Sequence, residues 1–476
     1  MITFLICLAL LVAAYFGYGA YLDHVCRINP KAAVPSATLY DGVDYIPMPR
    51  WRTFLIQLLN IAGIGPIFGA VMGACFGPVV FLWITFGGIF VGAMHDYISG
   101  VILLRNDGLS LPEIVGRYLG RGALIFMRSL SLVLLILVGV VFMRSPASIL
   151  SGMVSAIPYW GWIAIILVYY FIATMVPIDK LIGKIYPLFG AALIFMSVGL
   201  AWVLFMGDYT IPNLTFDTLR NYQANPTAMP IVPTLFITVA CGAISGFHAT
   251  QSPLMARCMN NESESRMVFY GAMITESIIA LIWAAIGMAF FHGPDALVAA
   301  LAEHGNDASW AVSTISKTTL GVAGGMIALF GVVSAAITSG DTAFRSARLI
   351  IADVLKFDQR PILKRFAIAL PLFTIAIVLL FVNFDVVWRY FAWTNQTLSV
   401  ITLWMIVTYL KKFKRNIWVA LPAAVLMTYI CISFVFISGQ FIGMANHTLA
   451  YILAGVMTLA ISAAMWVKVL KQSKLE

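Results

Sequence analysis

The sequence has little charge. Of its 476 residues, 10% are Asp, Glu, Lys or Arg, whereas soluble domains carry about 25%. Hydrophobic residues make up 61%, above the roughly 45–50% of soluble domains. These values exclude a soluble domain and a disordered chain. They also exclude a nucleic-acid partner despite the net charge of +9, because the basic residues cluster between long apolar runs. The composition indicates a helical protein that crosses the membrane many times.

Cysteine is also scarce. The chain has 6 cysteines, and four of them lie inside apolar runs, where a thiol packs as a small hydrophobic group: Cys7, Cys75, Cys241 and Cys431. No spacing of cysteine and histidine is typical of a metal site, and no nucleotide-binding motif occurs. We therefore predict no cofactor, no metal and no use of ATP as the energy source.

Thirteen runs are long and apolar enough to cross a membrane, which takes about 20 residues. They cover residues 2–22, 53–75, 78–104, 122–143, 160–177, 182–206, 231–256, 267–291, 319–343, 363–383, 387–410, 417–437 and 447–467. The first run lacks a basic leading segment and a small-residue cleavage site. We expect a retained helix there rather than a signal peptide.

The basic residues divide unequally between the two sets of alternate loops. Of the 29 Lys and Arg, 25 fall in one set, and the other set holds only Arg144, Arg220, Lys317 and Arg389. Because basic loops face the cytoplasm, the N-terminus is expected outside and the C-terminus inside.

Two of the runs are poor candidates for continuous helices. The run IAGIGPIFGAVMG places two glycines and a proline within Gly63–Pro66, and VACGAISGFHATQSP places glycines at both ends of Gly242–Gly246. Glycine costs about 1 kcal/mol in a helix interior and proline about 3 kcal/mol, so both helices should break there. For either run alone, close helix packing is the alternative. Broken backbone at membrane depth occurs where it lines a cavity or binds something.

The two breaks fall in the second and seventh runs, five spans apart. Because five is odd, spans 2–6 and 7–11 have opposite topology, which indicates an inverted repeat of five plus five helices. The predicted divisions are 1–50 (an extra helix and a cytoplasmic loop), 51–206 (first repeat), 207–230 (outer loop), 231–410 (second repeat) and 411–476 (two further helices). Substrate should bind between the breaks. The expected contacts are Gly63, Gly65, Gly242, Ser245, Gly246 and His248.

Ionisable residues inside membrane helices are costly and therefore indicate function. Glu276 lies nine residues into the eighth run, about 14 Å deep at 1.5 Å per residue. No basic residue lies within two turns of it on its own run. We predict that Glu276 carries a coupled proton, with His95, Asp96 and His248 as helpers. The alternative is a permanently protonated, structural glutamic acid.

Seven runs together resemble the carbon starvation protein A family of bacterial membrane transporters. They are IAGIGPIFGAVMG, GAMHDYISG, IDKLIGKIYPLFGA, CGAISGFHATQSP, YGAMITES, SGDTAFRSARLIIAD and RYFAWTNQTL. The resemblance covers most of the chain, which looks like the shorter form of the family. It implies a LeuT-like fold of the amino acid–polyamine–organocation type in the bacterial cytoplasmic membrane. It also implies uptake of pyruvate or small peptides during carbon limitation, driven by an ion gradient, most often of protons.

The leading hypothesis is a proton-coupled symporter and not an enzyme. Its partners are a small carboxylate or peptide, H+ or Na+, and the lipid bilayer, with no nucleic acid. The alternative is a sodium-coupled symporter of a small carboxylate or amino-acid-like solute. In LeuT-like folds a sodium site uses carbonyls of the first broken helix and nearby hydroxyls, and Thr338 and Ser339 stand in the matching span. Asp341 lies beside them, although it could simply pair with Arg345 one turn later. An intramembrane enzyme or a channel is less favoured.

Overall fold

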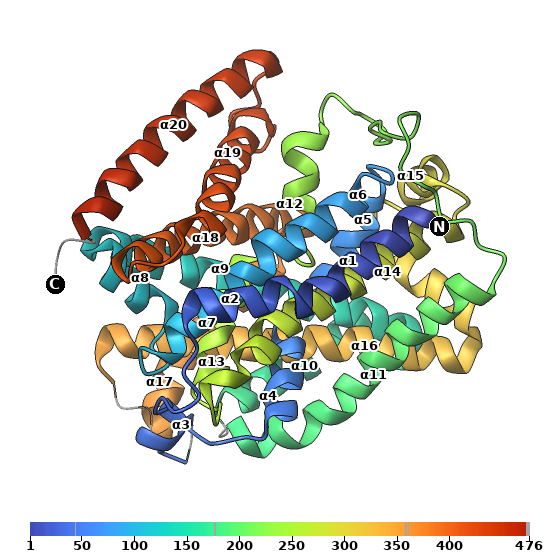
Figure 1. Cartoon of the computed structure of the whole chain (residues 1–476). Helices are drawn as coiled ribbons and strands as arrows, with labels where there is room; N and C mark the ends of the chain where they lie inside the picture. The colour runs from blue at the N-terminus through green and yellow to red at the C-terminus, as the bar shows by residue number, and fades with distance from the viewer. Residues whose placement is uncertain (43, 176–177, 358, 360, 473–476) are drawn as a thin grey trace.

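The computed structural model describes residues 1–42, 44–175, 178–357, 359 and 361–472, and their regular structure is helical, with no strand (Figure 1). By length and composition, nine helices of this described part could cross a membrane, or ten if one bent pair is a single span. The bent pair is the predicted run 53–75. The helices in the runs predicted at 160–177, 231–256 and 387–410 are not among those long and apolar enough to be counted as spans. The all-helical membrane fold is confirmed, and the count of thirteen spans stays a prediction.

The first half of the chain holds an N-terminal helix pair and then the helices of the first predicted repeat. The pair is α1 (Ile2–Phe16) and α2 (Tyr18–Cys26), followed by the short α3 (Pro35–Thr38). The remaining helices are α4 (Arg50–Ile61), the π-helical η1 (Gly65–Gly69), α5 (Ala70–Ala74), α6 (Val80–Leu82), the π-helical η2 (Trp83–Ala93), α7 (Met94–Leu104), α8 (Leu111–Leu119), α9 (Arg121–Met153), α10 (Tyr159–Met175) and α11 (Ile178–Met206).

The second half begins with another broken helix. Its elements are η3 (Ile231–Leu235), α12 (Phe236–Thr238), α13 (Gly246–Ala256), η4 (Glu262–Glu264), η5 (Arg266–Gly271), α14 (Ala272–Phe290), α15 (Pro294–Glu303), α16 (Ala308–Leu355), α17 (Ile362–Leu380) and α18 (Phe384–Lys412). The short η6 (Ile417–Val419) leads to α19 (Leu421–Ile437) and α20 (His447–Gln472), which stand apart from the core in Figure 1. The long α16 is two helices joined at a kink, where Gly321 has φ +67°.

Both predicted breaks are confirmed. Between Ile61 and Gly65 the chain bends by 57°. The second break leaves residues 239–245 outside any helix, between α12 and α13. Gly242 has φ +91° there, a backbone conformation that side chains with a Cβ rarely adopt. The glycines therefore end these helices, in addition to allowing close packing.

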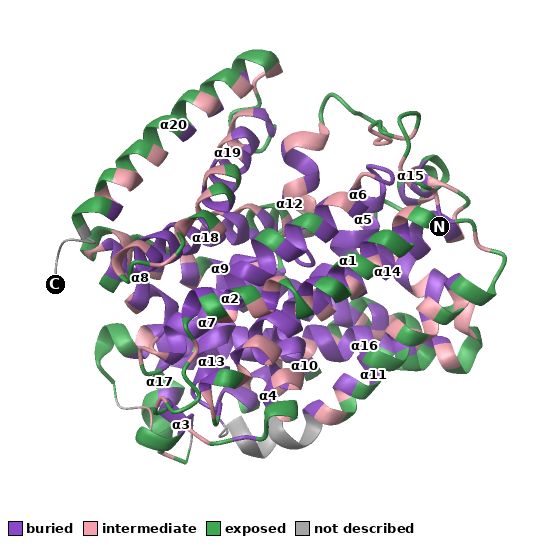
Figure 2. Ribbon diagram, in the orientation of Figure 1, coloured by how far each residue is buried: buried purple, intermediate pink, exposed green. Residues whose placement is uncertain are grey.

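The broken helices lie at the centre of the bundle. Figure 2 shows buried residues concentrated in the interior, whereas α20, α11 and α1 carry many exposed positions. In the most apolar stretch of Val80–Leu104, 94% of the residues are buried, and in that of Glu262–Phe290, 83% are buried. The share is 17% for His447–Lys471. Since the outer helices expose apolar side chains, they are suited to face lipid, and the central helices are the ones that can hold a site.

Candidate functional site

The two breaks touch each other. A Cβ added to Gly65 would collide with the side chain of Cys241, which lies in the second break. A Cβ on Gly63 would collide with Phe142 of α9 and come within 3.1 Å of the Ser339 hydroxyl on α16. The absence of side chains at these two glycines therefore lets the irregular segments of both halves meet at one place.

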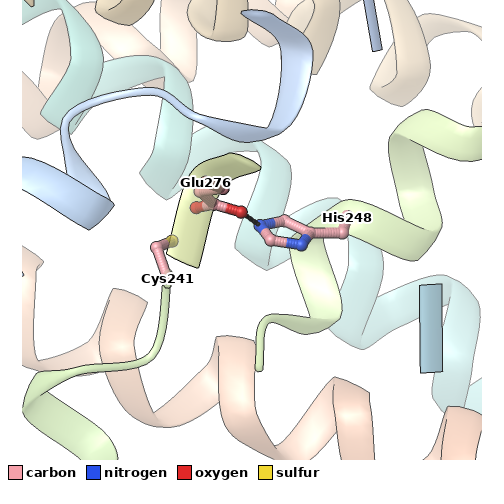
Figure 3. A group of neighbouring side chains, drawn as sticks. All are labelled: Cys241, His248 and Glu276. Atoms are coloured by element: carbon pink, nitrogen blue, oxygen red, sulfur yellow. Dashed lines mark ion pairs between the residues drawn. The ribbon is translucent and has the colours of Figure 1, made fainter. Parts of the chain in front are cut away.

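Four buried ionisable side chains form a continuous chain beside the second break. His95 Nδ1 lies 2.8 Å from Asp96 Oδ1, and Asp96 Oδ2 lies 2.8 Å from His248 Nδ1. His248 Nε2 in turn lies 3.3 Å from Glu276 Oε2. Figure 3 marks this ion pair with a dashed line. All four side chains are 0% exposed. They come from α7, α13 and α14, so the fold unites residues that the sequence spreads over 182 positions.

This arrangement can hold and pass a proton. A protonated imidazole of His248 can donate to both Asp96 and Glu276, whereas a neutral one donates only from one ring nitrogen. In the neutral case, contact with the second carboxyl group requires that group to carry the proton. Because uncompensated charge is costly at a buried site, the four side chains should exchange protons with one another and keep their charges balanced.

Glycines in η2 bring α7 close enough for these contacts. A Cβ on Gly92 would collide with the carbonyl oxygen of Ala243, and one on Gly88 would lie 3.3 Å from the carbonyl oxygen of Gly242. The sequence pattern Gly88–Gly92–Asp96 predicts one close-packing face, and the structure places that face against the second break. Asp96 can therefore reach His248 across the helix interface.

Cys241 is a site residue that the sequence did not indicate. Its Sγ, a ring nitrogen of His248 and a carboxylate oxygen of Glu276 all lie within 4.8 Å of one another (Figure 3). Thiolate, imidazole and carboxylate groups can bind a metal ion. Among the described residues, these three side chains form the one group whose ligand atoms lie that close together. A shared proton accounts for the contact between His248 and Glu276 without a metal. A single cysteine within an apolar run carries no signal that distinguishes this position from ordinary packing.

Two amide side chains of α18 support the broken backbone. Asn395 Oδ1 accepts hydrogen bonds from the Phe247 backbone N–H (2.7 Å) and from the Ser245 hydroxyl (3.0 Å). Gln396 Nε2 donates to the carbonyl oxygens of Phe236 (3.2 Å) and Ile244 (3.1 Å). The Asn395 side chain thus already accepts a hydrogen bond from one of the first backbone N–H groups of α13. A substrate carboxylate at this helix end would need the neighbouring amides or a displaced Asn395 side chain.

The predicted cation site lies against the first break. The Ser339 hydroxyl donates to the carbonyl oxygen of Leu59 at 2.9 Å, near the end of α4. The Thr338 hydroxyl lies 3.2 Å from the same oxygen and 2.9 Å from the carbonyl oxygen of Ala335 in its own helix. Asp341 accepts hydrogen bonds from Tyr169 (3.0 Å) and Tyr186 (3.2 Å). The structure therefore brings Thr338 and Ser339 together with a carbonyl of the first broken helix, and it places Asp341 between two tyrosines.

Arg345 is buried and lies close to Asp44. Its Nη1 lies 3.6 Å from Asp44 Oδ1, and its Nη2 donates to the carbonyl oxygen of Ala173 at 2.6 Å. Nearby, the Met48 backbone N–H donates to the carbonyl oxygen of Cys258 at 2.9 Å. Loops assigned to the cytoplasm by their basic residues thus pack against one another and close this end of the core.

The opposite end of the core is open. A cavity of about 850 Å³ is lined by Phe68, Met72, Ile237 and Thr238 of the two broken helices, and by residues of α9, α15, α18 and the loop before η3. We call it the outer cavity, because its rim consists of loops that the charge pattern assigns to the outside. The cavity therefore lies beside Phe68 and Thr238, which are a few residues from the two breaks.

Comparison with known proteins places the chain among membrane transporters. The family described as carbon starvation protein CstA matches residues 1–158 and 152–328. An uncharacterized membrane protein of Haemophilus influenzae is 44% identical over 346 residues, which cover 62% of this chain and 93% of that protein. The pyruvate/proton symporter BtsT of Escherichia coli is 26% identical, over 57% of this chain and 46% of that protein. A peptide transporter CstA of Campylobacter jejuni is also 26% identical, over 56% of this chain and 47% of that protein. The chain thus spans about half the length of these two named relatives.

Solved structures share the fold at low sequence identity. MhsT in complex with L-phenylalanine aligns with a TM-score of 0.55 and 11% identity, over 89% of this chain and 99% of that one. A manganese transporter of Eremococcus coleocola aligns with a TM-score of 0.54, also at 11% identity, over 91% of this chain and 98% of that one. These matches confirm the LeuT-like fold that the family resemblance implies. Since the family match covers more than half of the sequence, the chain belongs to the carbon starvation protein CstA family.

Proposed function

We propose that the protein is a secondary active transporter, a symporter that uses the proton gradient to import a small carboxylate such as pyruvate, or a small peptide. The observation that carries this proposal is the buried chain His95–Asp96–His248–Glu276 beside two touching helix breaks. The names of the relatives support a transporter rather than an enzyme. Both substrate classes carry a carboxylate, so the site chemistry alone does not choose between them.

Coupling follows from where the proton and the substrate meet. His248 belongs to the first turn of α13, at the second break, and also contacts Glu276. A proton on Glu276 removes a negative charge next to the break and so lowers the electrostatic cost of an anionic substrate there. Substrate and proton then bind together from the outer cavity. Both leave when the packed end opens, and the transporter returns empty.

The substrate is proposed to lie between the two breaks. Its expected contacts are those predicted from the sequence: Gly63, Gly65, Gly242, Ser245, Gly246 and His248. Backbone N–H groups at a helix N-terminus favour an anion, by up to about 2 kcal/mol when partly buried. The contact between Gly65 and Cys241 implies that the breaks separate slightly when substrate enters.

The proposed location is the bacterial cytoplasmic membrane, with the N-terminus outside and the C-terminus inside. The N-terminal ammonium group donates to the carbonyl oxygen of Ile211 at 2.7 Å, in the loop predicted to be external. At the other end, the Arg105 guanidinium contacts Glu262, in another loop assigned to the cytoplasm, and the Tyr409 hydroxyl, at the inner end of the run 387–410. These contacts support the predicted sidedness, and the five-plus-five division of residues 51–206 and 231–410 is retained as part of the proposal.

Purified protein in proteoliposomes should accumulate substrate when the outside is made acidic. We expect uptake of labelled pyruvate, or of a dipeptide such as dialanine, above its equilibrium level only while the pH gradient lasts. A proton ionophore should abolish this accumulation, and replacing sodium with choline should leave it unchanged. Accumulation that follows an imposed sodium gradient at equal pH on both sides would reject proton coupling.

Sodium coupling is the second candidate because Thr338 and Ser339 contact the carbonyl oxygen of Leu59. Hydroxyl and carbonyl oxygens are ligands that suit a hard cation. If sodium binds there, Thr338→Ala and Ser339→Ala should each abolish sodium-dependent uptake. Thr342→Ala is the matched control, because the Thr342 hydroxyl donates to carbonyl oxygens of its own helix, those of Thr338 (3.0 Å) and Ser339 (3.2 Å). Equal uptake by all three variants, with or without sodium, would reject the sodium site.

A further inference from the structure

Three side chains of the kinds that bind transition metals converge at the second break. The ligand atoms of Cys241, His248 and Glu276 lie within 4.8 Å of one another (Figure 3). Cys241 is 3% exposed and the other two are 0% exposed, so all three face one another away from solvent. A thiolate, an imidazole and a carboxylate are donors that suit Zn²⁺. The sequence spacing predicts no metal here, because the donors come from two helices and from the irregular segment that joins α12 to α13.

The spacing between His248 and Glu276 matches one edge of a zinc coordination tetrahedron. Zinc binds an imidazole nitrogen at about 2.0–2.1 Å and a carboxylate oxygen at about 2.0–2.2 Å, which separates the two atoms by about 3.4 Å at tetrahedral angles. His248 Nε2 and Glu276 Oε2 are 3.3 Å apart. With a zinc–sulfur bond of about 2.3 Å, the edges to sulfur measure about 3.6 Å. The Cys241 thiol therefore needs to move by only about 1 Å to become the third ligand, and a water can take the fourth position.

Asp96 holds His248 in the form that a metal ligand requires. Its Oδ2 lies 2.8 Å from His248 Nδ1, on the side of the ring away from Glu276. Histidines that bind metals almost always donate their other ring N–H to a carboxylate, a carbonyl or a water, which fixes the tautomer and the ring orientation. A neutral His248 that donates from Nδ1 to Asp96 has its lone pair on Nε2, the nitrogen beside Glu276. This contact is independent of the spacing of the three donors, and it points to the same ligand.

We infer that Cys241, His248 and Glu276 form a binding site for a thiophilic divalent metal ion such as Zn²⁺, and that this ion and the coupled proton exclude each other. Without the ion, Cys241 is a thiol, and His248 and Glu276 share one proton. The ion displaces both protons to solvent, and its two positive charges are balanced by the thiolate and the carboxylate. The buried site thus keeps the same net charge with and without the ion. The metal site stands on geometry, and only the exclusion of the coupled proton rests on the proposed function.

Cobalt(II) can report this site without transport. Co²⁺ occupies zinc sites, and a cobalt–thiolate bond adds a charge-transfer band in the near ultraviolet that nitrogen and oxygen ligands do not produce. Untagged, reduced protein should bind one Co²⁺ per chain with this band, and Zn²⁺ should displace the ion because it binds such sites more tightly. Cys241→Ser replaces the soft donor with a hydroxyl of similar size. The band should disappear in this variant, and the Kd for Zn²⁺ should rise by at least about tenfold, since loss of an outer-shell partner alone costs about 10–100-fold.

Cys431→Ser is the matched control, because it makes the same change at a buried cysteine of α19 that does not belong to the three-residue group. It should keep the cobalt band and the wild-type Kd for Zn²⁺. Thermal unfolding checks the fold of each variant, and Zn²⁺ should raise the Tm of the wild type and of Cys431→Ser more than that of Cys241→Ser. Wild-type protein without the band, or a band that persists unchanged in Cys241→Ser, would overturn the metal site.

Inhibition by zinc then connects the metal site to coupling. In proteoliposomes, Zn²⁺ should stop pH-driven accumulation of pyruvate or dialanine by occupying Glu276. Half-inhibition of Cys241→Ser, relative to its own rate without zinc, should need at least about tenfold more Zn²⁺. Accumulation that continues at full occupancy by Zn²⁺ would overturn the exclusion of the proton. If the cobalt band depends on Cys241 while no substrate is transported, the metal site stands and the proposed symport function fails. If transport occurs but the band is absent, the metal site fails alone.

Discussion

Replacing Glu276 with glutamine is expected to abolish accumulation of substrate while leaving its exchange across the membrane intact. Glutamine keeps the size and polarity of the side chain but cannot take up or release a proton. The variant should therefore still exchange labelled for unlabelled substrate in proteoliposomes. It should no longer concentrate substrate under an imposed pH gradient, and we expect accumulation to fall to the equilibrium level.

The Glu276→Gln experiment needs a control for the chemical change itself. Glu303→Gln makes the same substitution on an exposed residue of α15 and should behave like the wild type. If Glu276 is instead a permanently protonated structural residue, its glutamine variant will retain accumulation driven by the pH gradient. That result would contradict the proposed role, because a neutral amide would then serve as well as the carboxyl group.

The contact geometry explains why Glu276 is the best candidate in the buried chain. Its ion pair with His248 spans 3.3 Å, between His248 Nε2 and Glu276 Oε2. Asp96 contacts two imidazoles at 2.8 Å each, so its charge is well compensated. A carboxyl group with a longer ionic contact is easier to protonate without disturbing the fold. We therefore expect Asp96→Asn to damage structure more than Glu276→Gln does.

Much of the fold could be predicted because its signals are local in the sequence. Glycine and proline at Gly63–Pro66 and Gly242–Gly246 break helices by their own backbone preferences, and both breaks occur in the structure. The depth of Glu276 in an apolar run also marks it without knowledge of its neighbours. The sequence indicates Glu276 as the proton carrier and His95, Asp96 and His248 as helpers, but it does not give their contacts, since nothing in the sequence gives distances between helices.

The remaining features depend on contacts between distant segments. Cys241 looks like an apolar packing residue in the sequence, and only the turn at the second break directs its thiol toward Glu276. Asn395 lies 148 positions after the Phe247 backbone N–H that it caps. In the described part of the chain, the π-helical stretches η1, η2, η3 and η5 and the kink at Gly321 have no distinctive sequence pattern. Such features follow from packing, which is not encoded in local propensity.

Substituting alanine for Gly246 is expected to lower uptake by about fivefold or more, because overpacking of this kind costs about 1–3 kcal/mol and about 1.4 kcal/mol is a factor of ten. A Cβ at Gly246 would lie 2.6 Å from the backbone nitrogen of Ser399 and would also collide with the carbonyl oxygen of Asn395. Both atoms belong to the backbone of α18, so no side chain can rotate away to relieve the collision. The first turn of α13 must therefore move, and His248 moves with it.

Gly455→Ala in α20 is the matched control for this substitution. A Cβ there meets nothing within 4 Å, and alanine is favoured over glycine inside a helix, so stability and uptake should be preserved. Thermal unfolding of both purified variants separates loss of fold from loss of function. If Gly246→Ala remains folded, its pH-driven accumulation should decline together with substrate exchange. The exchange measurement distinguishes it from Glu276→Gln, because a displaced α13 disturbs the substrate site itself, whereas the glutamine removes only the proton. Wild-type uptake by Gly246→Ala would show that the close contact between α13 and α18 is not required for transport.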